Sequence, residues 1–254
     1  MKNGAVLKVR NLNKVFTLNH SGAASLKTAV LWWKDRGLEE LHVLKGVSFD
    51  VGRGECVAIV GRNGAGKSTL LSLIARIYRP TSGSIEVNGR LAPLLELGAG
   101  FHPDLTGLEN IFFNGIVLGL TRRQIEERLD SIIEFSELQG HVDTPVRTYS
   151  SGMMARLGFS IAMHVDADLL LVDEVLAVGD FQFQIKCQQR IAEFKAGGGT
   201  ILLVSHSEDD ITRIADRCVW LQGGSVQMIG APSEVMGAYE ACSQSDLLRP
   251  PGGD

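Results

Sequence analysis

The stretch GRNGAGKST, residues 61–69, decides the fold of this chain because three glycines stand directly before a lysine and two hydroxyl residues. Its first eight residues satisfy the pattern G-x-x-x-x-G-K-[ST]. Glycine adds no packing to a core, so this much bare backbone indicates contact with a ligand. The pattern predicts a loop whose backbone N–H groups surround phosphate oxygens, and its alternative is a glycine-rich turn that only caps a helix.

The segments on either side of this loop favour the phosphate interpretation. ECVAIV, residues 55–60, is apolar after its first residue, as expected for a strand buried on both faces. STLLSLIARI, residues 68–77, has helical spacing, with Leu70, Leu71, Ile74 and Ile77 on one side. A phosphate loop between a buried strand and a helix also receives the positive end of the helix dipole, so we expect a nucleoside triphosphate there.

The residues of the loop divide the work of holding such a nucleotide. We expect Lys67 to reach the β- and γ-phosphates and Ser68 to give a hydroxyl ligand to Mg²⁺. Thr69 follows near the α- and β-phosphates. The predicted nucleotide site consists of Gly61, Asn63, Gly64, Ala65, Gly66, Lys67, Ser68 and Thr69.

Two carboxylates predict the second half of the site. The aliphatic run LLLVDE ends in Asp173 and Glu174, and successive side chains of a strand diverge. Asp173 is therefore the candidate ligand of Mg²⁺, and Glu174 the candidate base that polarises an attacking water. The alternative is that the pair only begins a helix.

Composition excludes several classes of protein. The 254 residues include 44% hydrophobic and 21% charged residues, which is ordinary for a globular domain, and the net charge of −4 leaves no electrostatic footprint for nucleic acid. The four cysteines form no CxxC pair, which argues against a structural zinc site and a disulfide framework. No uninterrupted apolar run approaches the roughly 18 residues of a membrane span, so we expect the chain itself not to cross a membrane.

The remaining patterns predict an α/β fold. ADLLLVDE (167–174) and TILLVSHS (200–207) suit central parallel strands and flank a helical segment at 183–194. Residues 105–164 favour helices, with capping boxes at Thr106 with Glu109 and at Thr121 with Gln124. A hairpin is expected at 218–228, a short helix capped by Ser233 follows it, and residues 243–254 are expected to form a flexible tail.

The segment SLKTAVLWWKDR, residues 25–36, fits poorly into a compact core. Leu26, Ala29, Val30 and Trp33 line one face of a predicted helix whose remainder is cationic. It could be a surface helix of its own domain. Alternatively, Trp32 and Trp33 beside cations suit a membrane interface or a membrane-embedded partner.

YSSGM, residues 149–153, precedes the Asp-Glu pair, and VSHS follows it, and in this order the sequence resembles the ATP-binding-cassette (ABC) family. The usual signature of that family is LSGGQ, of which this chain keeps the serine and the second glycine. The resemblance covers nearly the whole chain and implies a P-loop NTPase domain at about 1–242, with an antiparallel β subdomain and an α-helical subdomain at about 103–165.

The resemblance also implies a head-to-tail homodimer in which each ATP lies between the phosphate loop of one subunit and the signature of the other. Ser150 and Gly152 would then donate to the γ-phosphate, and His206 would orient the water together with Glu174. Asp180 corresponds to the aspartate that links the two sites, and Phe16 to the aromatic residue that stacks on adenine.

One position departs from the family. A glutamine normally contacts Mg²⁺ in the loop that enters the helical subdomain, but residues 94–110, LLELGAGFHPDLTGLEN, contain none. Glu96 is the nearest polar replacement and is taken as a candidate metal contact. A carboxylate there would change the charge near the γ-phosphate and so slow or gate hydrolysis.

In four features the sequence is similar to the branch of the family that exports O-antigen, capsule and teichoic acid. They are residues 94–110, the YSSGM signature, DEVLAVGD at 173–180 and an insertion at about 17–42. In that branch the insertion is a gate helix beneath the permease. The resemblance implies a peripheral ATPase at the cytoplasmic face of the bacterial inner membrane, with a polytopic permease that contacts the glycan. The alternatives are the ATPase of a drug, ion or lipid exporter, and a soluble cassette protein that acts on ribosomes or DNA.

Overall fold

The computed structural model describes residues 4–18, 39–95, 97–98, 100–173, 179–205 and 208–247. Three predicted site residues, Glu96, Glu174 and His206, lie outside these ranges. The predicted insertion is described only at its two ends, so Trp32 and Trp33 also lie outside.

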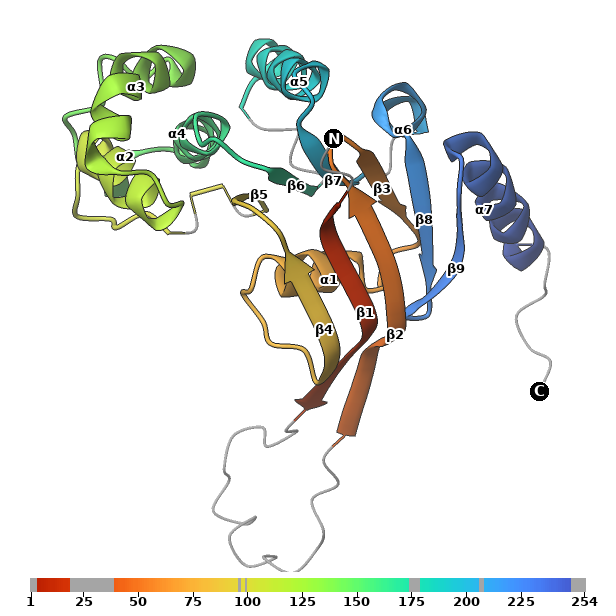
Figure 1. Cartoon of the computed structure of the whole chain (residues 1–254). Coiled ribbons are helices and arrows are strands. Elements are labelled where there is room, and N and C mark those ends of the chain that lie inside the picture. The colour runs from red at the N-terminus through yellow and green to blue at the C-terminus, as the bar shows by residue number, and fades with distance from the viewer. Residues whose placement is uncertain are drawn as a thin grey trace, which may run out of the picture.

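A six-stranded sheet forms the centre of the fold (Figure 1), in the order β5-β6-β7-β3-β8-β9. The strands from β5 to β8 are parallel to their neighbours, whereas β9 returns antiparallel to β8 after Gly223 and Gly224. The predicted central strands and the hairpin are therefore present. The bounds are β3 Cys56–Val60, β5 Leu91–Leu94, β6 Leu169–Asp173, β7 Thr200–Val204, β8 Arg217–Gln222 and β9 Ser225–Gly230.

Strand β3 is covered on both faces, which explains its continuously apolar sequence. Val57 and Ile59 belong to one hydrophobic cluster together with α1 (Lys67–Ile74). Ala58 and Val60 belong to another, with side chains from α6 (Glu208–Ile214) and α7 (Pro232–Leu247). Since successive residues of a strand point to opposite faces, both faces of β3 demand apolar residues.

A second sheet has the order β2-β1-β4 and is antiparallel, as the resemblance implies. Its strands are β1 (Ala5–Leu18), β2 (Glu39–Gly52) and β4 (Ser82–Val87). Residues of β1 and β2 share a buried cluster with α1 and with one face of the central sheet. Helix α1 ends at Ile74, earlier than predicted, and Arg76 adopts a left-handed φ of 63°. Ile77 is consequently exposed instead of lying on the apolar side of the helix.

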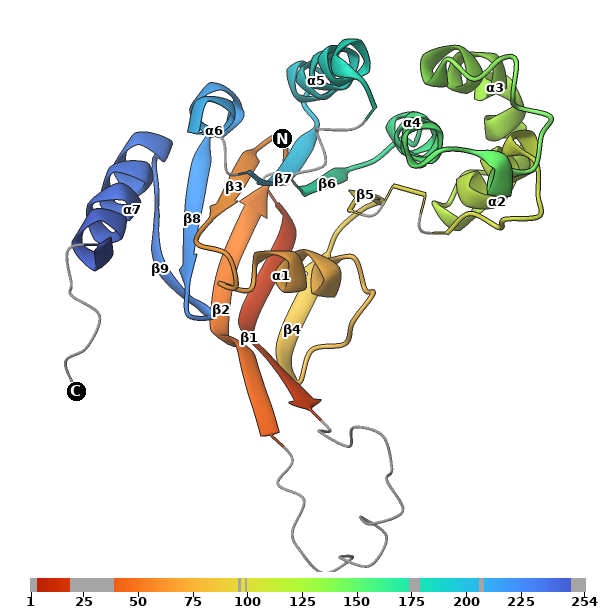
Figure 2. The same ribbon diagram turned by 180° about the vertical axis from the view of Figure 1, so that it is seen from behind.

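Three helices form one end of the molecule, away from α6 and α7 (Figures 1 and 2). They are α2 (Gly107–Val117), α3 (Arg122–Ser136) and α4 (Ser151–Met163), and a short 3-10 helix η1 (Val146–Thr148) precedes α4. Both predicted capping boxes are confirmed, because Thr106 and Glu109 bond reciprocally at α2, as do Thr121 and Gln124 at α3.

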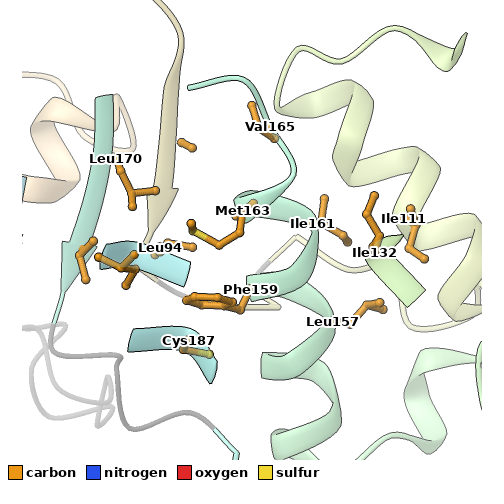
Figure 3. Packing of buried hydrophobic residues seen from close by; sticks show 14 of the residues in the cluster. Leu94, Ile111, Ile132, Leu157, Phe159, Ile161, Met163, Val165, Leu170 and Cys187 are labelled. Atoms are coloured by element: carbon orange, nitrogen blue, oxygen red, sulfur yellow. The ribbon is translucent and has the colours of Figure 1, made fainter. Parts of the chain in front are cut away.

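Phe159 of α4 joins this helical end to the central sheet. Figure 3 shows its ring extending from α4 toward Leu94 and Cys187. The ring lies 5.9 Å from that of Phe135, at the end of α3, and 6.2 Å from that of Phe183 in α5 (Phe181–Ala196). Aromatic rings at these distances stabilise a fold by more than the apolar area they bury. The three rings therefore hold α3, α4 and α5 together as one packed unit.

Helix α7 is longer than the short helix expected at Ser233. It begins at Pro232, where the missing N–H of proline costs no helical hydrogen bond. It continues to Leu247, beyond residue 243 at which the sequence places the start of the tail. Within the described part of the chain, no helix combines the length and the apolar character needed to cross a bilayer.

The aromatic cluster gives a stability prediction. Phe159 is 1% exposed, whereas Phe181 is 75% exposed. We expect Phe159→Ala to lower the free energy of unfolding by about 3–5 kcal/mol, since it removes a ring from a filled core. Phe181→Ala should change it by less than about 0.5 kcal/mol. Urea unfolding of the nucleotide-free protein, followed by circular dichroism, measures both, and equal effects would contradict the assigned core.

Candidate functional site

The loop between β3 and α1 has the conformation that its glycines allow. Gly61 has a φ of 152° and packs so closely that a Cβ would lie 2.2 Å from the carbonyl oxygen of Leu221. Gly66, with a φ of 99°, is the N-cap of α1, where a Cβ would lie 2.7 Å from Cδ2 of Leu44. Neither position has room for a side chain. The loop is thereby held against β8 and β2 with its backbone available to a ligand.

Lys67 closes this loop. It is the first residue of α1 and is 6% exposed, and its Nζ donates to the carbonyl oxygens of Gly61 at 2.7 Å and of Arg62 at 3.1 Å. A buried ammonium needs such partners. No side chain caps the first turn of α1, so its positive end faces the same region. An ammonium and a helix N-terminus together fit a phosphate.

The other predicted loop residues surround this centre. Ala65 is buried beneath the loop, Thr69 is half-buried in α1, and Asn63, Gly64 and Ser68 are exposed. The hydroxyl of Ser68 therefore stands at the surface beside the buried Lys67.

The strands place Asp173 at the same edge as the loop. Val204 of β7 pairs with Asp173 of β6 on one side and with Ile59 of β3 on the other, so all three strands end level. Two strand spacings put Asp173 about 10 Å from Ile59, and the loop begins two residues after Ile59. Ligands of parallel sheets bind outside the carboxyl ends of strands, where this arrangement brings the half-buried Asp173 and the loop together.

Mg²⁺ fits this pair of oxygen donors. The Ser68 hydroxyl and the Asp173 carboxylate are ligands that the ion accepts. Among the described residues, no group of three or more His, Cys, Asp or Glu side chains could hold a metal by itself. An ion bound here would complete its shell with water and phosphate oxygens, as Mg²⁺ does in nucleotide sites.

Phe16 has two neighbours that the sequence did not reveal. The ring of Tyr78 meets it edge to face with 5.5 Å between centroids. Nζ of Lys14 lies 4.6 Å from the centre of the Phe16 ring and donates to the carbonyl oxygen of Arg79 at 3.0 Å. Residues 16 and 78 meet because β1 passes beside the segment after α1. No local sequence pattern could predict this contact, since the two residues are far apart in the chain.

Ser150, Gly152 and Asp180 come together in a second place. They border a cavity of about 710 Å³ whose wall also includes Arg156, Glu137 and Gly179. Ser150 is the N-cap of α4 and accepts a hydrogen bond from Met153 N at 3.2 Å. Gly152 lies in the first turn that follows, so this cavity also faces the N-terminus of a helix.

Asp180 begins α5 in the same way. Its carboxylate accepts from Phe183 N at 3.0 Å and pairs with Arg156. The backbone hydrogen bond from Phe183 and the nearby Arg156 charge lower the pKa of this carboxyl, so it stays ionised near neutral pH. No residue of the phosphate loop borders the cavity, and Figure 1 shows α4 well apart from α1. The two groups of predicted site residues therefore lie in separate places within one chain.

Comparison with known proteins identifies relatives that cover most of the chain. The family described as ABC transporter matches residues 44–177. An O-antigen export system ATP-binding protein of Klebsiella pneumoniae is 46% identical over 92% of this chain and 97% of the relative. A teichoic acids export ATP-binding protein of Lactococcus lactis is 41% identical over 94% of this chain but only 51% of its own length.

Solved structures share the fold. The ATP-binding subunit of an ABC transporter, 26% identical, superimposes with a TM-score of 0.73 over 92% of this chain and 93% of its own. A dimeric ATP-binding cassette bound to ADP and Pi, 20% identical, gives a TM-score of 0.70 over 89% and 98%. These similarities confirm the predicted fold class.

The loop geometry predicts a graded effect of two substitutions. Gly61→Ala should destabilise the protein by more than about 2 kcal/mol, because the new Cβ meets a backbone oxygen at a strained φ. Gly64→Ala should cost only about 1 kcal/mol, since its φ is 81° but no atom lies within 4 Å of the added Cβ. Thermal unfolding without nucleotide measures the difference, and the opposite order would contradict the described loop.

Proposed function

Because the chain belongs to the ABC transporter family, whose members are ATPases, we propose that it powers the export of a lipid-linked polysaccharide through a separate membrane permease. The family and enzyme class predicted from sequence are thereby confirmed. The observation that carries the choice of cargo is the 46% identity, over nearly its full length, to an O-antigen export ATP-binding protein. The teichoic acid export relative points to the same class of cargo, a glycan on a lipid carrier.

The proposed working unit is a homodimer. The phosphate loop and the cavity beside Ser150 lie apart in one subunit, yet each adjoins a helix N-terminus suited to phosphate. Two subunits placed head to tail would bring the loop of one to the cavity of the other, with ATP between them. Ser150 and Gly152 then bind the γ-phosphate from across the interface, and Phe16 stacks on adenine in the subunit that holds the loop.

Hydrolysis in this site is attack of water on the γ-phosphorus with loss of ADP. Lys67 and the backbone of the loop bind the β- and γ-phosphates, while Ser68 and Asp173 would hold Mg²⁺, which would offset phosphate charge. Glu174 accepts the proton of the water, and His206 orients that water against the γ-phosphate. Asp180 would link the two sites of the dimer, and Glu96, which stands in sequence where the family has a glutamine, would contact the metal. These assignments to Glu174, His206 and Glu96 rest on their sequence positions.

An exposed apolar face supports a membrane partner. Phe113, Ile116 and Val117 of α2 are exposed and lie three and four residues apart, so they share one side of the helix. A groove beside them is bordered by Gly98, Phe101 and Val117. Exposed apolar patches of this kind mark interaction surfaces. We propose that the permease docks here, which places the subunit at the cytoplasmic face of the bacterial inner membrane.

A variant that traps ATP can identify the partner of this subunit. Glu174→Gln removes the proposed base but leaves the phosphate contacts, so it should retain ATP in a closed dimer. Purified from native membranes with ATP and Mg²⁺, this variant should bring with it a polytopic permease and glycosyltransferases, identified by mass spectrometry. The matched control, Lys67→Ala, should bind ATP at least about tenfold more weakly and form no ATP-dependent dimer.

The identity of the captured proteins decides between the functions. A permease without glycan enzymes would favour another exporter, and ribosomal or DNA-repair proteins without a permease would overturn the transport proposal. Turnover of ATP by Glu174→Gln at the wild-type rate would show that another group activates the water.

A double substitution tests whether the apolar face of α2 binds the permease. Phe113→Ala with Ile116→Ala should leave the ATPase activity of the isolated subunit within about twofold, because neither side chain touches the nucleotide site. The same variant should lose most of its binding to permease-containing membranes, since it removes an apolar anchor. Ile229→Ala, an exposed apolar change on β9, is the control and should bind normally. Retained binding by the double variant would move the docking surface elsewhere.

A further inference from the structure

Arg156 of α4 connects three elements that meet beside the cavity of Ser150. Its Nη1 donates to Oε2 of Glu137 at 2.9 Å, and its Nη2 donates to Oδ2 of Asp180. The guanidinium also lies 5.0 Å from the centre of the Phe183 ring. The side chain is 19% exposed, so these contacts are partly withdrawn from water.

Each carboxylate that Arg156 binds stands at the end of a helix. Glu137 is the C-cap of α3 and has a left-handed φ of 59°, which is uncommon for a residue other than glycine. Asp180 is the N-cap of α5. Arg156 therefore joins the end of one helix to the start of another through the helix that Ser150 begins.

Neighbouring groups hold Glu137 and the guanidinium of Arg156 in place. Lys186 binds Oε1 of Glu137 at 3.1 Å and donates to the carbonyl oxygen of Phe135 at 2.9 Å. Gly179 packs so closely that a Cβ there would lie 3.2 Å from Nε of Arg156. The contact network thus extends from the helical end of the molecule to the segment that carries Asp180.

We propose that Arg156 is a positioning residue that holds the Ser150 end of α4 in a single register with Asp180. This inference rests on the proposed function, in which one subunit presents Ser150, Gly152 and Asp180 together to the nucleotide of its partner. Ser150 lies six residues before Arg156, about 9 Å along the helix axis, so a small tilt of α4 moves the serine relative to Asp180.

The chemistry of arginine suits this task better than that of lysine. A planar guanidinium binds two carboxylates through separate N–H groups and can stack on an aromatic ring at the same time. Lysine offers one compact ammonium on a flexible stem and cannot span both acids in the same way. Loss of the guanidinium would also remove the cation that pairs with Asp180 beside a cavity that, on the proposed function, receives phosphate, and it would leave Glu137 paired with Lys186 alone.

The chain offers a matched control in Arg128 of α3. This arginine is 27% exposed, binds Asp166 at 2.6 Å and donates to the carbonyl oxygen of His164. It joins α3 to the segment after α4, as Arg156 joins α3 to the segment before α5, but it borders no predicted site residue in the described structure. Substitution of Arg128 therefore measures how much kcat and stability change when a comparable ion pair is broken away from the predicted site.

The experiment compares Arg156→Gln, Arg156→Lys and Arg128→Gln in the full chain. We expect Arg156→Gln to lower kcat for ATP at least about tenfold, with affinity for ATP in the isolated subunit unchanged, because the phosphate loop is intact. Arg156→Lys should fall between this variant and the wild type. Arg128→Gln should retain kcat within about twofold. Thermal unfolding of all three variants shows whether a lower kcat comes with a lower stability of the fold or arises while the stability is retained.

A double-mutant cycle with Asp180→Asn tests the contact itself. If Arg156 acts through Asp180, the two changes should be non-additive in kcat, with the double variant close to the slower single one. Wild-type kcat in Arg156→Gln, additive effects, or an equal loss in Arg128→Gln would each overturn the proposal and leave the proposed function standing. A wild-type protein that turns over no ATP would contradict the proposed function itself, and the role of Arg156 with it.

Discussion

Three parallel strands that end at the same level are the constraint on which the rest of this molecule depends. Val204 of β7 pairs with Asp173 on one side and Ile59 on the other, so whatever follows β3, β6 and β7 emerges at one edge. The phosphate loop follows β3 directly, and Asp173 ends β6. Burial on both faces keeps these strands from sliding, because a shift of one residue would turn apolar side chains to the wrong face. The hydrophobic core thereby sets the geometry of the charged site.

The second half of the proposed site depends on different forces. Ser150 and Asp180 stand at the beginnings of α4 and α5, and these helices are packed together by the rings of Phe159 and Phe183. Apolar packing is strong but not directional, whereas the two hydrogen-bonded contacts of Arg156 define an orientation. The packing holds the helices close, and the arginine specifies how they face each other.

The proposed dimer follows from the separation of the phosphate loop and the Ser150 cavity within one chain. Lys67 and the loop lie at the edge of the central sheet, while Ser150 lies at the helical end of the molecule. In the proposed dimer, ATP binds between the loop of one subunit and the Ser150 cavity of the other. Its binding therefore draws the two subunits together, and its hydrolysis releases them. The exposed apolar face of α2 lies in the same helical end, so a permease docked there, as we propose, would follow that movement.

Much of the fold and of the site was predictable from sequence because the responsible signals are local. The pattern around Lys67, the aliphatic run before Asp173, the capping boxes of α2 and α3 and the hairpin at Gly223 each lie within a short segment whose chemistry restricts the backbone. The premature end of α1, the full length of α7 and the contact of Phe16 with Tyr78 were not predicted, because packing beyond the segment decides them.

By itself, the sequence determined the α/β class, the phosphate loop and the membership of a family of ATPases. Only the tertiary structure decided which distant residues meet: Tyr78 with Phe16, and Arg156 with both Glu137 and Asp180. The physical reason is that local backbone preferences act over a few residues. Contacts between residues 19 or 24 positions apart exist only after hydrophobic burial has brought α3, α4 and α5 together.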